Sequence, residues 1–179
     1  MLEDSAKDRE AASVEEAADS EAGERAVAGR NEKMRPADFL QKLDDGAIAE
    51  AIQAAERQTS GEIRVFVTSQ NLRGDSVVKQ AAARFEKLGM TATRDRNAVL
   101  LYFVPRAHQF AIIGDRGIHE KCGETFWQDV ALNIHEKFMT GHFTDAIVGA
   151  IKTTGEVLAR YFPRSSDDRN ELPDQLEQD

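Results

Sequence analysis

An uninterrupted apolar run, Ala98 to Val104, lies just past the middle of this 179-residue chain. A strand with one solvated face alternates apolar and polar side chains, whereas a strand covered on both faces is apolar throughout. The run is also far shorter than the ~20 apolar residues that span a bilayer. It therefore predicts a central strand with helices on both sides of its sheet, and no direct insertion into a membrane.

Two further segments with β character lie on either side of this run. Residues 62–68 alternate apolar and polar side chains, and residues 109–113 follow the run after a short turn. A helix predicted to begin at Asp75 separates the first two strands, and strands joined by a crossover helix are normally parallel. The short turn instead predicts an antiparallel hairpin. The pattern indicates an α/β domain with a small mixed sheet.

Helical spacing accounts for most of the remaining sequence between residues 34 and 163. A short helix is expected from Pro36, and a second helix is expected to be capped by Asp44 or Asp45. Two amphipathic helices should complete the domain. Their apolar stripes are Phe126, Trp127, Val130, Ile134 and Phe138 in the first, and Ile147, Ala150, Ile151, Val157, Leu158 and Tyr161 in the second.

The net charge of −9 belongs to the two ends of the chain. Residues 1–33 carry a balance of −5 and residues 164–179 a balance of −4, so residues 34–163 are neutral. The end segments have few large apolar side chains and are expected to be disordered acidic tails, the alternative being specific docking peptides. A neutral domain lacks the basic surface that nucleic acids require. The acidic start has no signal-peptide pattern, so a cytoplasmic location is expected.

Polar side chains are expected to gather at one edge of the predicted sheet. With the strand directions above, the starts of the two parallel strands lie beside the end of the third strand. The residues concerned are Glu62, Asp95, Asn97 and Asp115, with Gly114 and Gly117 allowing close backbone approach. Carboxylate and amide oxygens suit Ca²⁺ or Mg²⁺, and Arg96, Arg116 and His119 could contact an anion or a partner. The alternative is that the acidic and amide side chains only initiate turns.

Spacing excludes several common active sites. The pairs His119-Glu120 and His135-Glu136 lack the second histidine of a zincin helix, because Gly123 and Met139 stand in its place. Cys122, the only cysteine, cannot form an intramolecular disulfide or a cysteine-based zinc site and is expected to be a small buried apolar residue. No Gly-x-Gly-x-x-Gly, Walker or Gly-x-Ser-x-Gly motif occurs.

Three segments together resemble the TPM domain family, in particular its small bacterial members. They are residues 54–65, residues 93–104 and residues 110–120, followed by Phe126-Trp127. The similarity extends over about residues 37–163 and implies a Rossmann-like α/β/α sandwich, so residues 34–163 are taken as a TPM domain. The family's acidic cluster, linked to divalent cations, maps to Asp95, Asn97 and Asp115. Many relatives have Asn-Gly where this chain has Asn97-Ala98.

The resemblance leaves two functions to be weighed. The family is named after phosphatase activity in a plant member, which implies a metal-assisted phosphomonoester hydrolase with Asp95 or Asp115 as ligand or base and Arg116 balancing phosphate charge. Other relatives are accessory proteins, which implies a non-catalytic module that docks an unknown protein partner, with or without Ca²⁺ or Mg²⁺ bound. The second function is the primary expectation, because no nucleophile and base are persuasively spaced.

Overall fold

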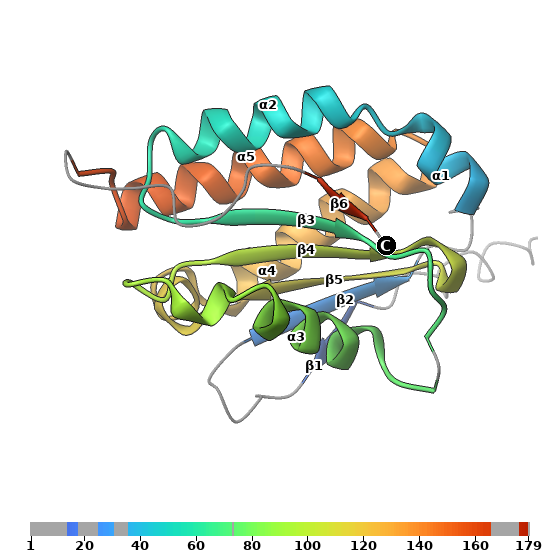
Figure 1. The fold of residues 1–179 in the computed structure, drawn as a ribbon, viewed down its shortest axis with the longest axis horizontal. Coiled ribbons are helices and arrows are strands. Elements are labelled where there is room, and N and C mark those ends of the chain that lie inside the picture. The colour runs from blue at the N-terminus through green and yellow to red at the C-terminus, as the bar shows by residue number, and fades with distance from the viewer. Residues whose placement is uncertain (1–13, 18–24, 31–35, 73, 166–175, 179) are drawn as a thin grey trace, which may run out of the picture.

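The computed structural model describes residues 14–17, 25–30, 36–72, 74–165 and 176–178 (Figure 1). A six-stranded mixed sheet in the order β1-β2-β5-β4-β3-β6 forms the middle layer. The strands are β1 (Val14–Ala17), β2 (Arg25–Arg30), β3 (Ile63–Val67), β4 (Val99–Val104), β5 (Gln109–Gly114) and β6 (Glu177–Gln178). The helices are α1 (Pro36–Lys42), α2 (Asp45–Glu56), α3 (Val77–Lys87), α4 (Arg116–Met139) and α5 (Phe143–Tyr161), with short 3-10 turns at Met90–Ala92 and Pro105–Ala107.

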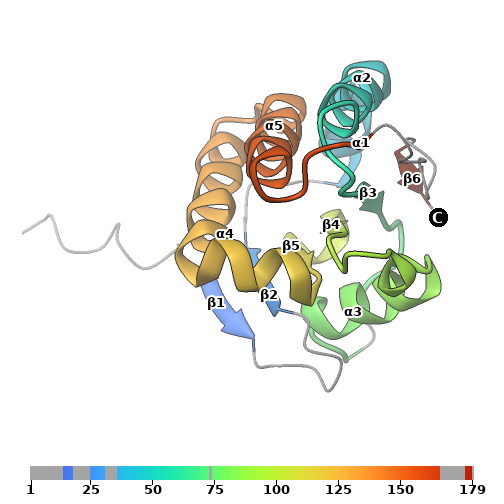
Figure 2. The same ribbon diagram turned by 90° about the vertical axis from the view of Figure 1, so that its left-hand side faces the viewer.

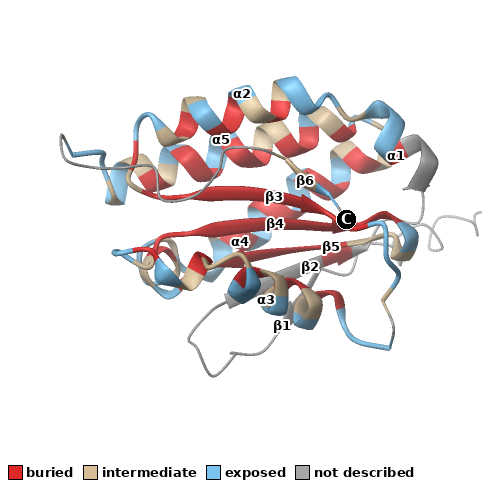
Figure 3. Ribbon diagram, in the orientation of Figure 1, coloured by how far each residue is buried: buried red, intermediate tan, exposed pale blue. Residues whose placement is uncertain are grey.

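Helices cover both faces of the sheet, so the domain is an α/β/α sandwich. Viewed along the strands, α2, α4 and α5 lie on one side and α3 lies on the other (Figure 2). Strand β4 is buried at all six positions, as are all five positions of β3 (Figure 3). The prediction that Ala98 to Val104 forms a central, doubly covered strand is confirmed. Within the described residues, no helix is both long and apolar enough to cross a membrane.

The sheet separates two hydrophobic clusters, and alternate residues of each strand contribute to each cluster. The larger cluster contains Val65, Leu101 and Ile112, which are paired across the three central strands, and it packs against α1, α2, α4 and α5. The smaller cluster packs against α3 and contains Leu100 and Ile113. At the centre of the larger cluster lies a group of aromatic rings, Phe39, Phe103, Phe110, Phe138 and Phe143.

The helix starts agree with the sequence at some positions and not at others. Asp44 caps α2 by accepting a hydrogen bond from the Ala47 backbone N–H at 2.9 Å. The cap of α3 is Ser76 and not Asp75, since the Ser76 hydroxyl accepts from Lys79 N. Asp75 instead pairs with the Lys79 ammonium at 2.8 Å. Serine and aspartate are about equally good caps, so neighbouring candidates cannot be ranked by residue type.

Helix α4 begins ten residues earlier than its apolar stripe suggests. It starts at Arg116, and its early part is set off by a kink at Gly123, whose backbone has φ 73° and ψ −179°. The sequence places the helix from Phe126 because Gly117 and Gly123 are poor helix formers. The apolar stripe therefore marks only the later part of α4, and its first turns have no apolar pattern that predicts them.

Strands also lie inside both segments that are expected to be disordered tails. Strand β2 pairs antiparallel with β5 over residues 25–30, and β6 pairs parallel with β3. Strand pairing supplies backbone hydrogen bonds without requiring an apolar stripe, which is why composition misses these segments. Residues 14–17, 25–30 and 177–178 therefore lie in strands, although the sequence predicts disorder for the segments that contain them. For the residues of the two segments that the structure does not describe, disorder stays a prediction.

Candidate functional site

The strand directions bring the predicted polar residues to one edge of the sheet, which is called the rim and comprises residues 59–62, 93–98 and 114–117. Strand β3 runs parallel to β4, and β4 runs antiparallel to β5. The ladder continues to the rim through hydrogen bonds from Val99 N to Glu62 O at 2.8 Å and from Asp115 N to Ala98 O at 2.9 Å. Glu62, Ala98 and Asp115 therefore lie in line across three strands, and the predicted strand arrangement is confirmed.

Asp115 is the most deeply buried ionisable residue of the rim, with no solvent exposure. Its Oδ2 accepts a hydrogen bond from Arg96 Nε at 2.7 Å, and its Oδ1 accepts one from the Arg116 backbone N–H, also at 2.7 Å. The residue is thus both the N-cap of α4 and one half of a charge-assisted ion pair. These two bonds join the loop before β4 to the start of α4.

Arg96 adopts a backbone conformation that side-chain-bearing residues rarely occupy. Its φ is +50°, in the left-handed region, which costs a residue with a Cβ about 1–2 kcal/mol. The conformation is held by the Asp115 ion pair and by a hydrogen bond from Gly117 N to Arg96 O at 2.8 Å. Together these contacts fix the loop against α4.

Gly114 and Gly117 of the rim permit close packing, as predicted. A Cβ at Gly117 would collide with the carbonyl oxygens of Asp95 and Arg96, and a Cβ at Gly114 would collide with the ring of Trp127. The loop therefore lies directly on the backbone of α4, and the indole lies directly on the end of β5. Larger residues at either position would push the rim apart.

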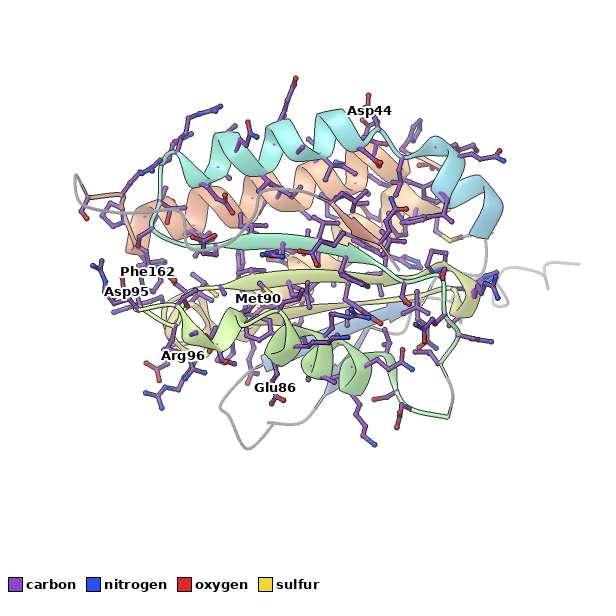
Figure 4. The ribbon with its side chains drawn as sticks, viewed as in Figure 1. Asp44, Glu86, Met90, Asp95, Arg96 and Phe162 are labelled. Carbon is purple, nitrogen blue, oxygen red and sulfur yellow. The ribbon has the colours of Figure 1, made fainter. Side chains whose placement is uncertain are left out.

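The four predicted ligand residues share the rim but differ in surroundings. Glu62 and Asn97 are buried at 4% and 1% exposure, and Asn97 Nδ2 donates to Ser60 Oγ at 3.3 Å. Asp95 is exposed and pairs with Arg94 at 3.5 Å. Asp95 and Arg96 lie at the same end of the molecule as Phe162 (Figure 4), whose carbonyl oxygen accepts from Ser60 N.

Ala98 occupies the position between the two buried carboxylates of the rim. Because Ala98 pairs across the ladder with Glu62 on one side and Asp115 on the other, its methyl group stands between their side chains on the α3 face. Ala98 is itself fully buried in the smaller cluster. Over the described part of the chain, no three His, Cys, Asp or Glu side chains are grouped to hold a metal ion. The divalent-cation site stays a prediction.

The remaining predicted contact residues lie on the first turn of α4. Arg116 is 64% exposed and pairs with Glu120 at 3.4 Å. His119 is half-buried, and its backbone N–H donates to Asp115 O at 3.0 Å. The exposed part of the rim is therefore charged, with arginine and carboxylate side chains side by side.

Sequence reasoning missed a second polar region at the carboxyl ends of β3 and β4. A hollow of about 220 Å³ is lined by Thr68, Gln70, Asn71, Gln80, Ala83, Arg84, Lys87 and Tyr102. The Arg84 guanidinium lies 4.0 Å from the centre of the Phe66 ring, and Phe66 stacks on Tyr102. No motif marks these residues; only the rule that α/β sheets place ligand sites at the carboxyl ends of their strands points to this location.

Cys122 is half-buried rather than fully buried, and it packs on the larger cluster. Burial disfavours the thiolate and raises the pKa of the Cys122 thiol to about 11. At pH 8 we expect Cys122 to react with a disulfide reagent about 200-fold more slowly than an ordinary cysteine of pKa ~8.5, in proportion to its thiolate fraction. The rate should still rise tenfold per pH unit above pH 9, measured by absorbance. A plateau near pH 9 in the folded chain would contradict this; the chain unfolded in urea is the control.

The fold and the rim define a three-layer α/β protein whose edge loop is held to a helix start by a buried aspartate. The sequence profile of the TPM domain family (TPM_phosphatase) matches residues 34–157, which are most of the chain. The chain therefore belongs to the TPM domain family. It is also similar to the NMR structure of the BA42 protein from the psychrophilic bacterium Bizionia argentinensis, with a TM-score of 0.70 and 35% identity, covering 77% of this chain and 96% of BA42. The comparison with curated proteins gives no match.

Proposed function

We propose that this TPM-domain protein is a non-catalytic binding module that docks a partner protein through its rim. The observation that carries the proposal is that the Asp115 carboxylate is buried and fully engaged in hydrogen bonds. Its two oxygens accept hydrogen bonds from Arg96 and from the start of α4, and the side chain is inaccessible to solvent. A catalytic metal site or a catalytic base needs an open position where water or substrate can bind, whereas the enclosed Asp115 side chain holds the rim together.

The outer surface of the rim suits protein docking. Four charged side chains of the rim, Arg94, Asp95, Arg96 and Arg116, and the adjacent Glu120 on α4 are between 36% and 64% exposed. Because the Asp115 ion pair and Gly117 fix the backbone beneath them, these side chains are presented from a rigid base. Complementary charges steer association and set specificity. With three arginines and two carboxylates, the surface favours a partner that presents more carboxylates than amines.

The alternative function is the metal-assisted hydrolysis of phosphomonoesters. It would require Asp95 or Asp115 to bind a cation or activate water, with Arg116 near the phosphate. Asp95 is exposed beside Arg94, while Asp115 is buried beside Arg96, so a shared ion would need at least one of these ion pairs to open. A cation bound at the rim without hydrolysis is compatible with the docking proposal.

Ion titration and a hydrolysis assay on the full chain distinguish these functions. We expect no turnover of p-nitrophenyl phosphate with millimolar Ca²⁺, Mg²⁺ or Mn²⁺, because the buried Asp115 offers no open position. Amide NMR spectra recorded in the same titrations locate any bound ion. Ion-dependent turnover that is lost in Asp115→Asn and kept in Asp129→Asn, a matched exposed aspartate on α4, would overturn the proposal in favour of the hydrolase.

Docking is tested with charge reversals of the exposed arginines. A partner that cross-links to the full chain in cells should be lost with the pair Arg94→Glu and Arg116→Glu. It should be kept with Arg160→Glu, which changes an exposed arginine on α5. Equal loss in both variants would mean that the rim does not select the partner.

A further inference from the structure

The side of β3 that faces away from β4, called the β3 edge, is an apolar strand edge. All five residues of β3, Ile63–Val67, are buried. On this side the strand pairs with β6 through Phe66↔Glu177 and Val67↔Gln178. An apolar edge strand is a ready template for another extended chain. In this protein that position is taken by a segment far away in sequence.

Arg64 gives the β3 edge chemical specificity. It is the charged residue within an otherwise apolar strand, and its side chain is only 5% exposed. It forms an ion pair with Glu177, whose side chain is 27% exposed. A buried guanidinium costs several kcal/mol of desolvation unless a carboxylate is well placed beside it. The edge therefore selects a strand that carries an acidic residue next to Arg64.

Leu176 adds an apolar requirement on the other face of the sheet. It is half-buried and packs on the larger cluster, on the α2 and α5 side. Consecutive residues of a strand point to opposite faces, so Leu176 and Glu177 fill both sides of the β3 edge at once. The arrangement recognises an apolar residue followed by an acidic one, in an extended segment parallel to β3.

The pairing of β6 with β3 is short enough to be exchanged. Only two residues of β6 are in register with the five residues of β3. Each backbone hydrogen bond contributes only about 0.5–1.5 kcal/mol net, and strand addition to an exposed edge is a recurring mode of peptide recognition. A longer partner strand could pair with β3 over more of its length than β6 does.

We propose that the β3 edge is a strand-addition site for an extended acidic segment of a partner protein, and that residues 176–178 occupy it in cis until such a segment displaces them. The partner segment carries an apolar residue followed by Asp or Glu. Its carboxylate replaces Glu177 at Arg64, its apolar residue replaces Leu176, and its backbone pairs with β3. This site is separate from the rim, because β6 pairs near the carboxyl end of β3 and the rim lies at its start.

The first test uses a dye-labelled peptide of residues 171–179 as the probe and the full-length chain as the receptor. In the Glu177→Arg variant the cis strand loses its ion pair and places a positive charge beside Arg64, so the site should open. We expect the peptide to bind this variant at least ~10-fold more tightly than the unaltered chain, because a site closed in most molecules lowers the apparent affinity in proportion. Glu156→Arg, an exposed reversal on α5, should bind like the unaltered chain. Fluorescence anisotropy measures all three.

The second test exchanges the charges of the proposed pair. In the double variant Arg64→Glu and Glu177→Arg, the native peptide should no longer bind, since it would face a carboxylate at residue 64. In this double variant, however, residues 64 and 177 still attract each other, so residues 176–178 can still occupy the edge. The receptor for the exchanged peptide is therefore the double variant Arg64→Glu with Glu177→Gln. A peptide that carries the Glu177→Arg change should bind this receptor, and the native peptide should not. Native-peptide binding that is insensitive to the residue at 64 would overturn the proposal.

Two further outcomes would also overturn it. Equal affinity of the peptide for the unaltered chain and for Glu177→Arg would show that residues 176–178 do not occlude the edge. This comparison alters only a partly exposed residue at the end of the described chain, so it does not depend on tolerance of the core. Sedimentation that shows a dimer of the unaltered chain, lost in Glu177→Arg, would assign the edge to a second copy instead of a different partner.

Discussion

Leu101→Ala is expected to lower the free energy of unfolding by about 2–5 kcal/mol, which is the range for large-to-small changes in a well-packed core. Leu101 is fully buried in β4 and paired with Val65 and Ile112 on the adjacent strands. Its side chain enters the larger cluster, where helices pack against the same face of the sheet. Removal of the isopropyl group beyond Cβ leaves a cavity that the fixed strands cannot close. Urea denaturation measures the loss.

Leu132→Ala provides the matched control. Leu132 lies on α4 with 43% exposure, and alanine is the better helix former, so its substitution should change stability by less than about 0.5 kcal/mol. A cost below about 1 kcal/mol for Leu101→Ala would mean that β4 is not the doubly covered centre of the sheet. Because both variants replace leucine by alanine, a difference between their losses of stability reports the burial of the position and not the chemistry of the substitution.

The central strands could be predicted from the sequence because burial on two faces leaves a direct mark on residue type. Ala98 to Val104 is apolar throughout, and this alone places β4 inside the sheet. The parallel direction of β3 follows from the crossover through α3, and the antiparallel direction of β5 follows from the short turn at Pro105–Ala107. These are local consequences of chain connection, so no tertiary information is needed.

The sequence of β6 has no apolar pattern that would predict a strand. It consists of two polar residues, and what holds it is the pairing of its backbone with β3 and of Glu177 with Arg64. Arg64 itself fits a strand with one solvated face, because its neighbours alternate with it. In the structure its side chain is only 5% exposed and pairs with Glu177 of β6, which is distant in sequence. Periodicity describes a strand's own residues and not the segments that cover it.

The candidate site was predictable in position and not in chemistry. Strand directions place Glu62, Asn97 and Asp115 at one edge, but the sequence does not reveal that Arg96 would turn back and take one oxygen of Asp115. That contact depends on the positive φ of Arg96 and on the close approach that Gly117 permits. Asp115 and Arg96 form a clasp that joins the loop before β4 to the start of α4.

Gly123→Ala is expected to destabilise the protein by about 1–3 kcal/mol, the usual cost of a side chain in a backbone region that is essentially restricted to glycine. Gly123 has φ 73° and ψ −179° at the kink of α4. An added Cβ would meet no atom within 4 Å, so steric collision with the rest of the protein is not the cause. The cost arises from the backbone alone. It should appear as a lower urea midpoint with an unchanged slope.

Gly149→Ala is the matched control and should have the opposite sign. Gly149 lies inside the regular helix α5, where alanine is favoured over glycine by about 0.5–1 kcal/mol. Its new Cβ would meet Asn133 Oδ1 at an ordinary 4.0 Å and Lys137 Nζ at 2.8 Å, and the flexible end of that lysine can move aside. If both substitutions stabilise the protein, α4 continues as a straight helix through Gly123. The kink would then not determine the direction of the first turn of α4. Only the loop before β4 would keep Arg96 close to Asp115.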